Sequence, residues 1–425
     1  MPVWKESSAS ENQAPSIGIR IVCLNWICLL AFLGLLLLPF IRRMEGQGTV
    51  PVSPAPRQPN SKSGQTQLPK QLGDHYLMLI NTAIASQMNP EKFAQFEKSP
   101  YDGLAVAFLH AYDVSRVPTV AEMDARINEW KKTTTKDIWP WVYINRMLAV
   151  DPADKNPYSK DAYFRAFSGL DFEDRAGAQK DFLQYWQNAL AVAKDTRAPG
   201  IVYDPEFYNY QSAYDVGLLA QQTKKKPEEV VVLLQQLGAR MADSATAQYP
   251  GAVLWFMFTG FGYPEFKVID GRPYYPSPAY IAFGLLDEIQ NRHLPLKVIS
   301  GGEGSLAYCH ETLQQFQDVI SKRDLKFAPL VQKYQGILEL GGTMTLWSDR
   351  AHKQGWVKEG ACDTSAAATV EDLQPYLELL LRSFRYNWIY GSGDGGYMAF
   401  VPLNADRFDA VITKAKSRAY STISH

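Results

Sequence analysis

The chain has 425 residues, enough for one large domain or two of ordinary size. Its 43 Lys and Arg residues balance 44 Asp and Glu residues, and the formal net charge is -1. Because no basic surplus exists to neutralise phosphates, nucleic acid is not an expected partner. Aromatic residues make up 12% of the chain. Most of them must fill a core, and others are available to stack on the apolar faces of sugar rings.

An uncharged apolar run, Ile21 to Ile41, follows a short N-terminal tail of residues 1–20. It is long enough to cross a bilayer, and it predicts a transmembrane anchor. A cleaved signal peptide is the alternative, but Arg42 and Arg43 follow the run where a small-residue cleavage site would be needed. Basic residues flank the run on both sides, so their count does not decide its orientation.

Residues 42–73 are rich in Pro, Ser, Gln and Gly and have little apolar content. Such a composition cannot bury enough surface to fold, so this segment is predicted to be a disordered linker. The folded domain is expected to span residues 74–417, followed by a short C-terminal tail of residues 418–425.

Short apolar runs recur through this domain, as buried parallel strands do. They are Tyr76–Asn81, Gly103–Phe108, Ile138–Ile144, Gly200–Tyr203, Ala252–Phe258, Leu296–Ser300, Gly342–Trp347 and Asn387–Tyr390.

Helical patterns lie between most of these runs. Thr119 and Glu122 form a capping box, and Pro227 fits the first turn of another helix. The positions expected to face inward are Met123, Ile127, Trp130, Phe182, Trp186, Leu190, Leu233, Leu237, Met241, Ile281, Leu285, Ile289, Leu313, Phe316, Ile320, Leu377 and Leu380. Eight strands alternating with helices predict an α/β fold, the (β/α)₈ TIM barrel. A doubly wound open sheet is the alternative, but the stretch LMLINTAIASQ at its first turn lacks the glycines of a phosphate loop.

Two carboxylates lie at the end of the fourth predicted strand, in the stretch GIVYDPEFYNY. Strand side chains alternate between faces, so Asp204 and Glu206 point the same way as Val202, while Tyr203 points the other way. Pro205 cannot donate to a sheet ladder, so the strand should end there. The pair is therefore expected at the carboxyl end of the strand, where barrel enzymes have their active sites. The alternative is that the two acids form a structural ion pair with Arg146 or cap a loop.

Polar residues also lie near the ends of the other strands. Glu303 lies in the Gly-rich turn after the sixth strand and is the candidate partner for the strand-four pair. Two carboxyl groups across a cleft are the minimal equipment for hydrolysing a glycosidic bond. We therefore expect Glu206 as general acid, Asp204 as its assistant and Glu303 as nucleophile or base. Further candidates for substrate binding are Asp102, Asn145, Arg146, Tyr208, Tyr263, Trp347, Asp349, Trp388 and Asp394, and Trp139 is another candidate stacking ring.

The Asp-x-Glu motif Asp204-Pro205-Glu206 is similar to the strand-four end of family 18 chitinases and family 25 lysozymes. In those families the Glu donates the proton and the Asp assists it. The motifs PYDG (Pro100–Gly103), DPE and YNWIY (Tyr386–Tyr390) resemble a group of secreted bacterial proteins described only as glycoside-hydrolase-like. The resemblance spans nearly the whole domain and implies a barrel that acts on carbohydrate. It departs from the large retaining clan, because the seventh strand carries no Glu.

Other chemistries lack their motifs. No H-x-H motif for a metal-dependent barrel hydrolase is present, and no G-x-S-x-G elbow, so neither a metal nor a cofactor is expected. A non-catalytic sugar-binding barrel tethered to the membrane remains the alternative to a membrane-anchored glycoside hydrolase. The expected partners are a carbohydrate and, through Ile21–Ile41, a membrane. The glycan, endo or exo action and the oligomeric state are not specified by the sequence.

The cysteines bear on localisation. Cys23 and Cys28 lie in the apolar run, whereas Cys309 and Cys362 follow the sixth and seventh strands on one rim of the predicted barrel. Neighbouring loops there can bring two cysteines within disulfide reach. A bridge would persist in an oxidising compartment, in agreement with a periplasmic or extracellular domain. Two unpaired buried cysteines are the alternative.

Overall fold

The computed structural model describes most of the folded domain. The described residues are 70, 72–81, 85, 88–108, 117–143, 170, 172, 178–205, 215–261, 267–306, 310, 312–345, 370–391 and 405–421. The predicted anchor, Ile21–Ile41, and residues 42–69 of the linker lie outside this set. Within the described part, no helix is long and apolar enough to cross a membrane.

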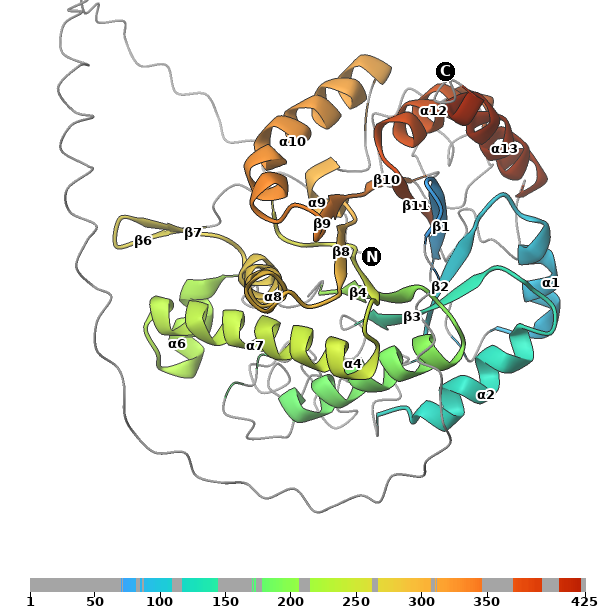
Figure 1. The fold of residues 1–425 in the computed structure, drawn as a ribbon. Helices are drawn as coiled ribbons and strands as arrows, with labels where there is room; N and C mark the ends of the chain where they lie inside the picture. The colour runs from blue at the N-terminus through green and yellow to red at the C-terminus, as the bar shows by residue number, and fades with distance from the viewer. Residues whose placement is uncertain are drawn as a thin grey trace, which may run out of the picture. The chain divides into compact units, whose positions relative to one another are not determined.

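A parallel sheet forms the centre of the domain (Figure 1). Its neighbours run in the order β10-β11-β1-β2-β3-β4-β5-β8-β9, and every pairing between them is parallel. The strands are β1 (Tyr76–Asn81), β2 (Gly103–Ala107), β3 (Asp137–Tyr143), β4 (Gly200–Asp204), β5 (Val253–Phe256), β8 (Lys297–Ser300), β9 (Leu338–Leu340), β10 (Gly342–Thr345) and β11 (Tyr386–Gly391). All eight predicted strands are confirmed.

The sheet closes on itself through its seventh strand. The two ends of the strand order, β9 and β10, are consecutive in the chain and are separated only by Gly341. The first half pairs with β8 and the second with β11. If β9 and β10 are counted as one strand, the sheet of nine strands becomes the eight-stranded sheet of a (β/α)₈ barrel. The predicted barrel is therefore confirmed, and the open sheet is excluded.

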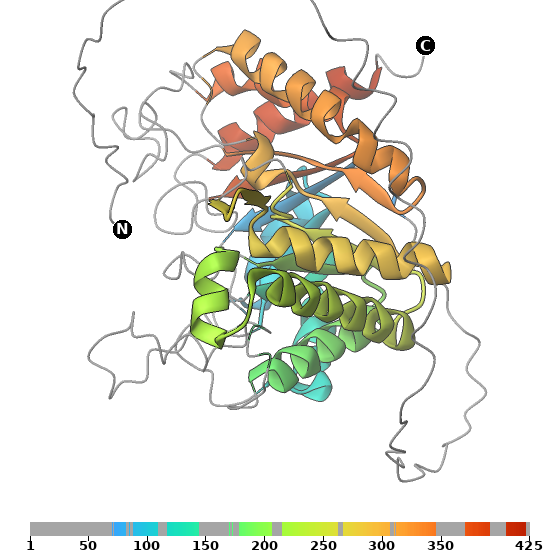
Figure 2. The ribbon, with the colours of Figure 1, turned by 90° about the vertical axis from the view of Figure 1, so that its left-hand side faces the viewer.

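Helices surround the barrel, and α4, α7 and α8 lie side by side on its outside (Figures 1 and 2). The helices are α1 (Pro90–Lys98), α2 (Val120–Trp130), α4 (Ala178–Asp195), α6 (Val216–Thr223), α7 (Pro227–Gln248), α8 (Ser277–Arg292), α9 (Glu303–Leu306), α10 (Leu313–Lys333), η3 (Glu371–Leu373), α12 (Gln374–Ser383) and α13 (Ala405–Ser421). The capping box of Thr119 and Glu122 is present, and Pro227 begins α7 as predicted.

The predicted inward positions on these helices are buried, with two exceptions. Leu313 is 38% exposed because it is the first residue of α10, directly after its N-cap. Leu233 is only half-buried. The buried stripe of α7 instead runs through Leu234, beside Leu237 and Met241.

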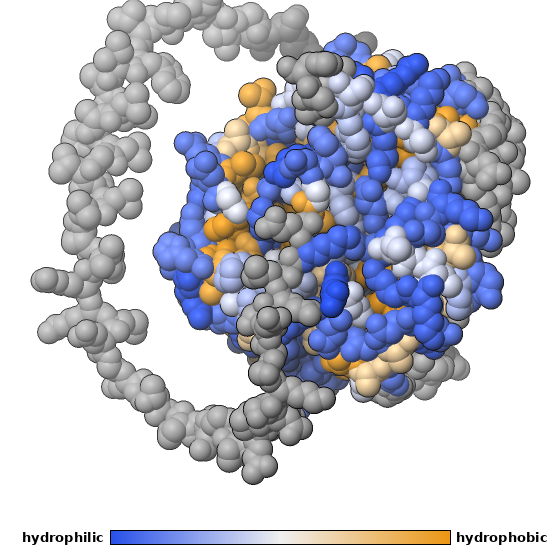
Figure 3. Space-filling model, turned by 45° about the vertical axis from the view of Figure 1, so that its right-hand side comes forward, coloured by the Kyte–Doolittle hydropathy of each residue, from blue (hydrophilic) through white to orange (hydrophobic). Residues whose placement is uncertain are grey.

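Two hydrophobic layers follow from the alternation of strand side chains. The outer layer packs the barrel against the helices and includes Ile201 and Tyr203 of β4. The inner layer fills the barrel and includes Val202, Trp139, Trp255 and Trp388, among others. Hydrophilic residues cover most of the face drawn in Figure 3, and hydrophobic ones occupy smaller areas between them.

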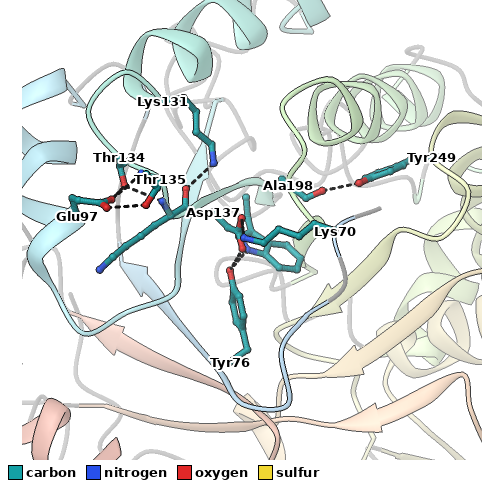
Figure 4. Close-up of polar contacts among 11 residues, drawn as sticks. Lys70, Tyr76, Glu97, Lys131, Thr134, Thr135, Asp137, Ala198 and Tyr249 are labelled. Atoms are coloured by element: carbon teal, nitrogen blue, oxygen red, sulfur yellow. Dashed lines mark hydrogen bonds and ion pairs between the residues drawn. The ribbon is translucent and has the colours of Figure 1, made fainter. Parts of the chain in front are cut away.

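A polar network closes the amino-terminal end of the barrel (Figure 4). Asp137, the first residue of β3, is 2% exposed and accepts hydrogen bonds from Tyr76 Oη at 3.0 Å and Lys70 Nζ at 2.8 Å. Trp139 Nε1 donates to Tyr76 Oη at 2.8 Å. Burial and the neighbouring Asp137 raise the pKa of Tyr76 well above its usual value, so the phenol stays neutral and can donate. In barrel enzymes the residues at this end contribute to the stability of the fold, whereas the active site lies at the other end.

A small antiparallel hairpin, β6 (Lys267–Ile269) and β7 (Arg272–Tyr274), interrupts the connection from β5 to α8. Arg272 and the Tyr274 hydroxyl both donate to Glu228 Oε1 at 3.0 Å, so the hairpin is attached to the start of α7. Figure 1 shows it reaching away from the barrel.

Candidate functional site

Asp204 lies where the sequence predicted, as the last residue of β4. It follows Val202 of the inner layer at the spacing of two that keeps strand side chains on one face, so it points into the barrel. Its exposed fraction is 2%. Opposite it in the register is Tyr143, the last residue of β3. The carboxylate is thus on the inner side of the carboxyl rim, where barrel active sites form.

Backbone hydrogen bonds join β4 to the turn that carries Glu303. The N–H of Met257 donates to Tyr203 O at 2.9 Å, and the N–H of Glu303 donates to Met257 O at 3.2 Å. Tyr203 directly precedes Asp204, and Met257 directly follows β5. Asp204 and Glu303 are therefore placed on the same rim, one on each side of the end of β5.

Two glycines allow this close approach. A Cβ on Gly301 would lie 2.8 Å from Phe256 O and 3.0 Å from Trp388 Nε1. Gly302 has a φ of 91°, in the left-handed region that side chains rarely adopt, and a Cβ there would lie 3.0 Å from Gly341 O. The Gly-Gly pair before Glu303 is thus a requirement of the fold that fixes where Glu303 begins α9.

Trp388 supports the same turn from inside the barrel. Its exposed fraction is 0%, and its indole Nε1 donates to Gly301 O at 2.9 Å. Trp139, the other described ring proposed for stacking, is also fully buried and donates to Tyr76 at the amino-terminal end. Both rings belong to the inner layer, so in this structure they are core residues.

Asp102 corrects one sequence prediction. It precedes β2, and its Oδ2 accepts from the N–H of Leu77 at 2.8 Å. Lys416 on α13 also donates to it, at 3.1 Å. The carbonyl of Asp102 accepts from the N–H of Asp137, so Asp102 lies at the amino-terminal end of the strands. A substrate-binding role beside Asp204 does not fit this position, because the two acids are at opposite ends of the barrel.

One residue near the turn was not found from the sequence. Arg323 of α10 is 3% exposed and donates to Gly341 O at 2.8 Å and to Ser300 O at 3.1 Å. Burial lowers its pKa to about 10, which leaves it protonated at neutral pH. The sequence did contain a signal: Arg323 follows Phe316 and Ile320 at the helical spacing of the buried face, where an apolar residue is expected.

The remaining predicted residues lie outside the described part of the chain. They are Glu206, Asn145, Arg146, Tyr208, Tyr263, Trp347, Asp349 and Asp394, together with Cys309 and Cys362. Among the residues that are described, no cluster of His, Cys, Asp and Glu has the arrangement of a metal site.

No family model matches the chain, and no curated protein matches it. Solved structures match over most of their length. A GH18 chitinase, ChiB from the chitin utilization locus of Flavobacterium johnsoniae, is 8% identical over 81% of this chain and 94% of its own, with a TM-score of 0.40. A GH5-4 broad specificity endoglucanase from an uncultured bacterium is 12% identical over 77% and 84%, with a TM-score of 0.46. Endo-glycoceramidase II from Rhodococcus sp. is 11% identical over 79% and 78%, also with a TM-score of 0.46.

At identities of 8–12% and TM-scores of 0.40–0.46 these likenesses carry no argument about this chain. The barrel is established by the strand pairing. A sugar epimerase, D-psicose 3-epimerase, also matches, at 10% identity over 82% of this chain and 100% of its own, with a TM-score of 0.39. Function must therefore be argued from the residues of this chain.

Proposed function

We propose that the chain is a glycoside hydrolase that cleaves a poly- or oligosaccharide by carboxylate acid/base catalysis at the carboxyl rim of its barrel. Glu206 is the general acid, Asp204 assists it, and Glu303 is the nucleophile or base. No cofactor takes part.

One observation carries the proposal: Asp204 is a carboxylate buried on the inner side of the carboxyl rim. Burying an ionised carboxylate costs free energy that pairing and hydrogen bonds must offset, and a role in catalysis is a reason for such a group to lie there. Glu206 follows at the spacing of two, after a proline that ends the strand. An ionised Asp204 nearby would raise the pKa of Glu206, as a proton donor at neutral pH needs.

Glu303 supports the proposal as the second carboxyl group. Its backbone is fixed to Met257, on the other side of the end of β5 from Asp204. Two acids on opposite sides of a substrate position are what glycoside hydrolysis requires. The anomer released first discriminates the mechanisms: retention needs a carboxyl separation of about 5–5.5 Å, and inversion about 6.5–9.5 Å.

The test uses the full chain, a panel of polysaccharides and three variants. We expect Glu206→Gln to lose at least about 100-fold in kcat, the lower end of what a positioned general acid contributes, while sugar binding is retained. Asp204→Asn should lower kcat and move the basic limb of the pH profile to lower pH. Asp318→Asn, an exposed carboxylate on α10, is the control and should behave as wild type.

Two results would contradict the proposal. Full turnover by Glu206→Gln would remove the general acid from its role. Sugar binding without cleavage of any glycan by the wild type would favour the alternative, a non-catalytic carbohydrate-binding barrel.

We also propose that Ile21–Ile41 anchors the chain in a membrane, with the barrel on the periplasmic or extracellular side. The uncharged length of this run supports the anchor. Fractionation with carbonate washing checks it, and protease access to intact cells checks the side. Release of the full-length chain by carbonate would overturn the anchor.

A further inference from the structure

The inward stripe of α10 contains a cation among apolar residues. The buried residues of this helix are Phe316, Ile320, Arg323 and Phe327, at spacings of four, three and four. Such spacing defines the face of a helix that packs on the core. A guanidinium at such a position costs free energy because its charge is removed from water, and an apolar side chain would avoid that cost. A specific interaction should therefore explain why Arg323 is there.

Its hydrogen bonds span the point where the seventh strand is divided. Nη1 donates to the carbonyl of Gly341, between β9 and β10, and Nη2 donates to the carbonyl of Ser300, at the end of β8. Ser300 O also accepts from the N–H of Gly341 at 2.8 Å. The planar fork of an arginine can hold two such acceptors at once. Arg323 therefore fixes the ends of two neighbouring strands on the carboxyl rim.

The same guanidinium lies against the turn before Glu303. A Cβ built on Gly302 would come within 3.2 Å of Arg323 Nη2. The carbonyl of Gly302 accepts from the N–H groups of Ser305 and Leu306 at 3.0 and 2.8 Å, which forms α9. Glu303 thus directly follows a glycine at which a side chain would meet the guanidinium.

The charge of Arg323 has no ion-pair partner in the described part of the chain. Its neighbours are carbonyl oxygens and two rings, with the guanidinium carbon 5.0 Å from the centroid of Phe384 and 5.8 Å from that of Phe327. The charge of Asp324, the next residue along the helix, also acts on the guanidinium. The charged and titratable side chains on the elements packed around it are Asp318, Lys322, Asp324, Lys326 and Lys333 on α10, Glu303 on α9, His310 before α10, Glu339 on β9, and Tyr376, Glu378 and Arg382 on α12. Glu339 and Glu378 are in ion pairs with other basic residues.

We propose that Arg323 is a positioning residue for Glu303: it fixes the turn Gly301–Gly302–Glu303 and supplies a permanent positive charge behind it. A positive charge in a buried setting favours the ionised form of a nearby carboxyl group. Glu303 is therefore held as a carboxylate, which suits a nucleophile or base. This inference rests on the proposed function for its kinetic readout only.

The first experiment compares Arg323→Met with wild type in the full chain. Methionine keeps much of the volume and removes both the charge and the fork. We expect the acidic limb of the kcat/KM profile to move up by about one pH unit, because Glu303 is then protonated more easily. We expect kcat to fall about tenfold or more, because the turn loses its two anchors. Arg292→Met on the exposed surface of α8 is the control, and its profile should match wild type.

Arg323→Lys separates charge from geometry. Lysine keeps the positive charge and cannot hold both carbonyl groups in the same fork. We expect its acidic limb to stay with wild type while kcat falls. This variant also tests the proposal if Arg323→Met does not fold. If the acidic limb of Arg323→Lys moves up by about one pH unit, the retained charge has no effect and the electrostatic part of the proposal is overturned. If kcat of Arg323→Lys equals that of wild type, the positioning part is overturned.

A second readout does not depend on turnover. The side-chain carbon of Glu303, labelled with ¹³C and assigned by comparison with Glu303→Gln, reports its own titration by NMR. If the chain cleaves no glycan, the proposed function fails, yet a raised Glu303 pKa in Arg323→Met still supports the inference. A Glu303 pKa equal to that of wild type in folded Arg323→Met would overturn it, whatever the activity.

Discussion

The indole N–H of Trp388 donates a hydrogen bond of 2.9 Å to the carbonyl oxygen of Gly301. This bond joins the inside of the barrel at β11 to the turn that carries Glu303, across the closure of the sheet. Arg323 holds the same turn from the helix side, through Ser300 and Gly341. The turn is thus supported from both sides of the barrel wall, as a residue with a positional role requires.

Replacing Trp388 with Phe removes the donor and keeps much of the ring. We expect a loss of about 1–3 kcal/mol in the free energy of unfolding, because a buried carbonyl loses its partner and the core loses volume. We also expect kcat to fall about tenfold, because Glu303 is less well positioned. Urea unfolding and initial rates on a cleaved glycan measure the two effects.

Trp255→Phe is the matched control. Trp255 is fully buried in the same inner layer, and its Nε1 has no hydrogen-bond partner among the residues that the structure describes. Its replacement should cost stability through packing alone and leave kcat per folded molecule unchanged. Equal losses of kcat in the two variants would show that general loosening of the barrel, rather than the Gly301 bond, controls activity.

Gly302→Ala tests the geometry of the turn. The backbone φ of 91° is unfavourable for alanine, and its Cβ would meet Gly341 O at 3.0 Å and Arg323 Nη2 at 3.2 Å. We expect a destabilisation of about 1–3 kcal/mol from the strained backbone, and more from the contacts. Gly336→Ala is the control, because Gly336 has a φ of 78° and open space around it. If both variants lose the same stability and neither loses activity, the turn tolerates displacement and Glu303 has no fixed position.

The strands of the barrel were predictable because each is a short, continuous apolar run, the pattern of a parallel strand buried on both faces. Strand β9 was missed because it is short and carries Glu339, which forms ion pairs with Lys297 and Arg385. The hairpin β6–β7 was also missed, although Asp270-Gly271 between its strands is a turn signal.

The candidate site was predictable only in part. Asp204 was placed correctly because strand alternation and Pro205 fix its face and its end of the strand. Asp102 was wrongly included among the substrate-binding candidates: it directly precedes the second strand, and in a parallel barrel the residues before the strands lie at the end opposite the active site. Arg323 was missed because its role depends on the carbonyl groups of Ser300, at the end of β8, and of Gly341, between β9 and β10, and no local sequence pattern connects these to α10.

Asp137→Ala tests the closed end of the barrel. The variant leaves the hydroxyl of Tyr76 and the ammonium of Lys70 without their shared acceptor. We expect a loss of about 2–3 kcal/mol in the free energy of unfolding, typical of a buried hydrogen bond to a charged group. Activity per folded molecule should be unchanged, because barrel active sites lie at the other end. Asp318→Ala, at an exposed position on α10, is the control. A fall in kcat for Asp137→Ala would contradict the assignment of the active site to the other end of the barrel.

Asp124 on α2 predicts a pH dependence of stability. Burial, followed by the like charge of Asp195 at the end of α4 and a hydrogen bond between the two side chains, raises the pKa of Asp124 to about 6. The folded protein therefore binds a proton at Asp124 more tightly than the unfolded chain does. Its free energy of unfolding must fall as pH rises from the usual aspartate range through about 6, and the penalty is complete above that.

Asp124→Asn should remove this penalty, since the amide is neutral and still donates to Asp195. Above pH 7 we expect the variant to be more stable by about 1 kcal/mol, a value reduced because solvent screens a partly exposed pair. Below pH 4 the advantage should vanish, because Asp124 is then protonated in both folded and unfolded states. Urea unfolding at several pH values measures the difference, with Glu129→Gln on the exposed side of the same helix as control. A gain that is the same at pH 4 and pH 8 would mean that the two carboxyl groups do not share a proton.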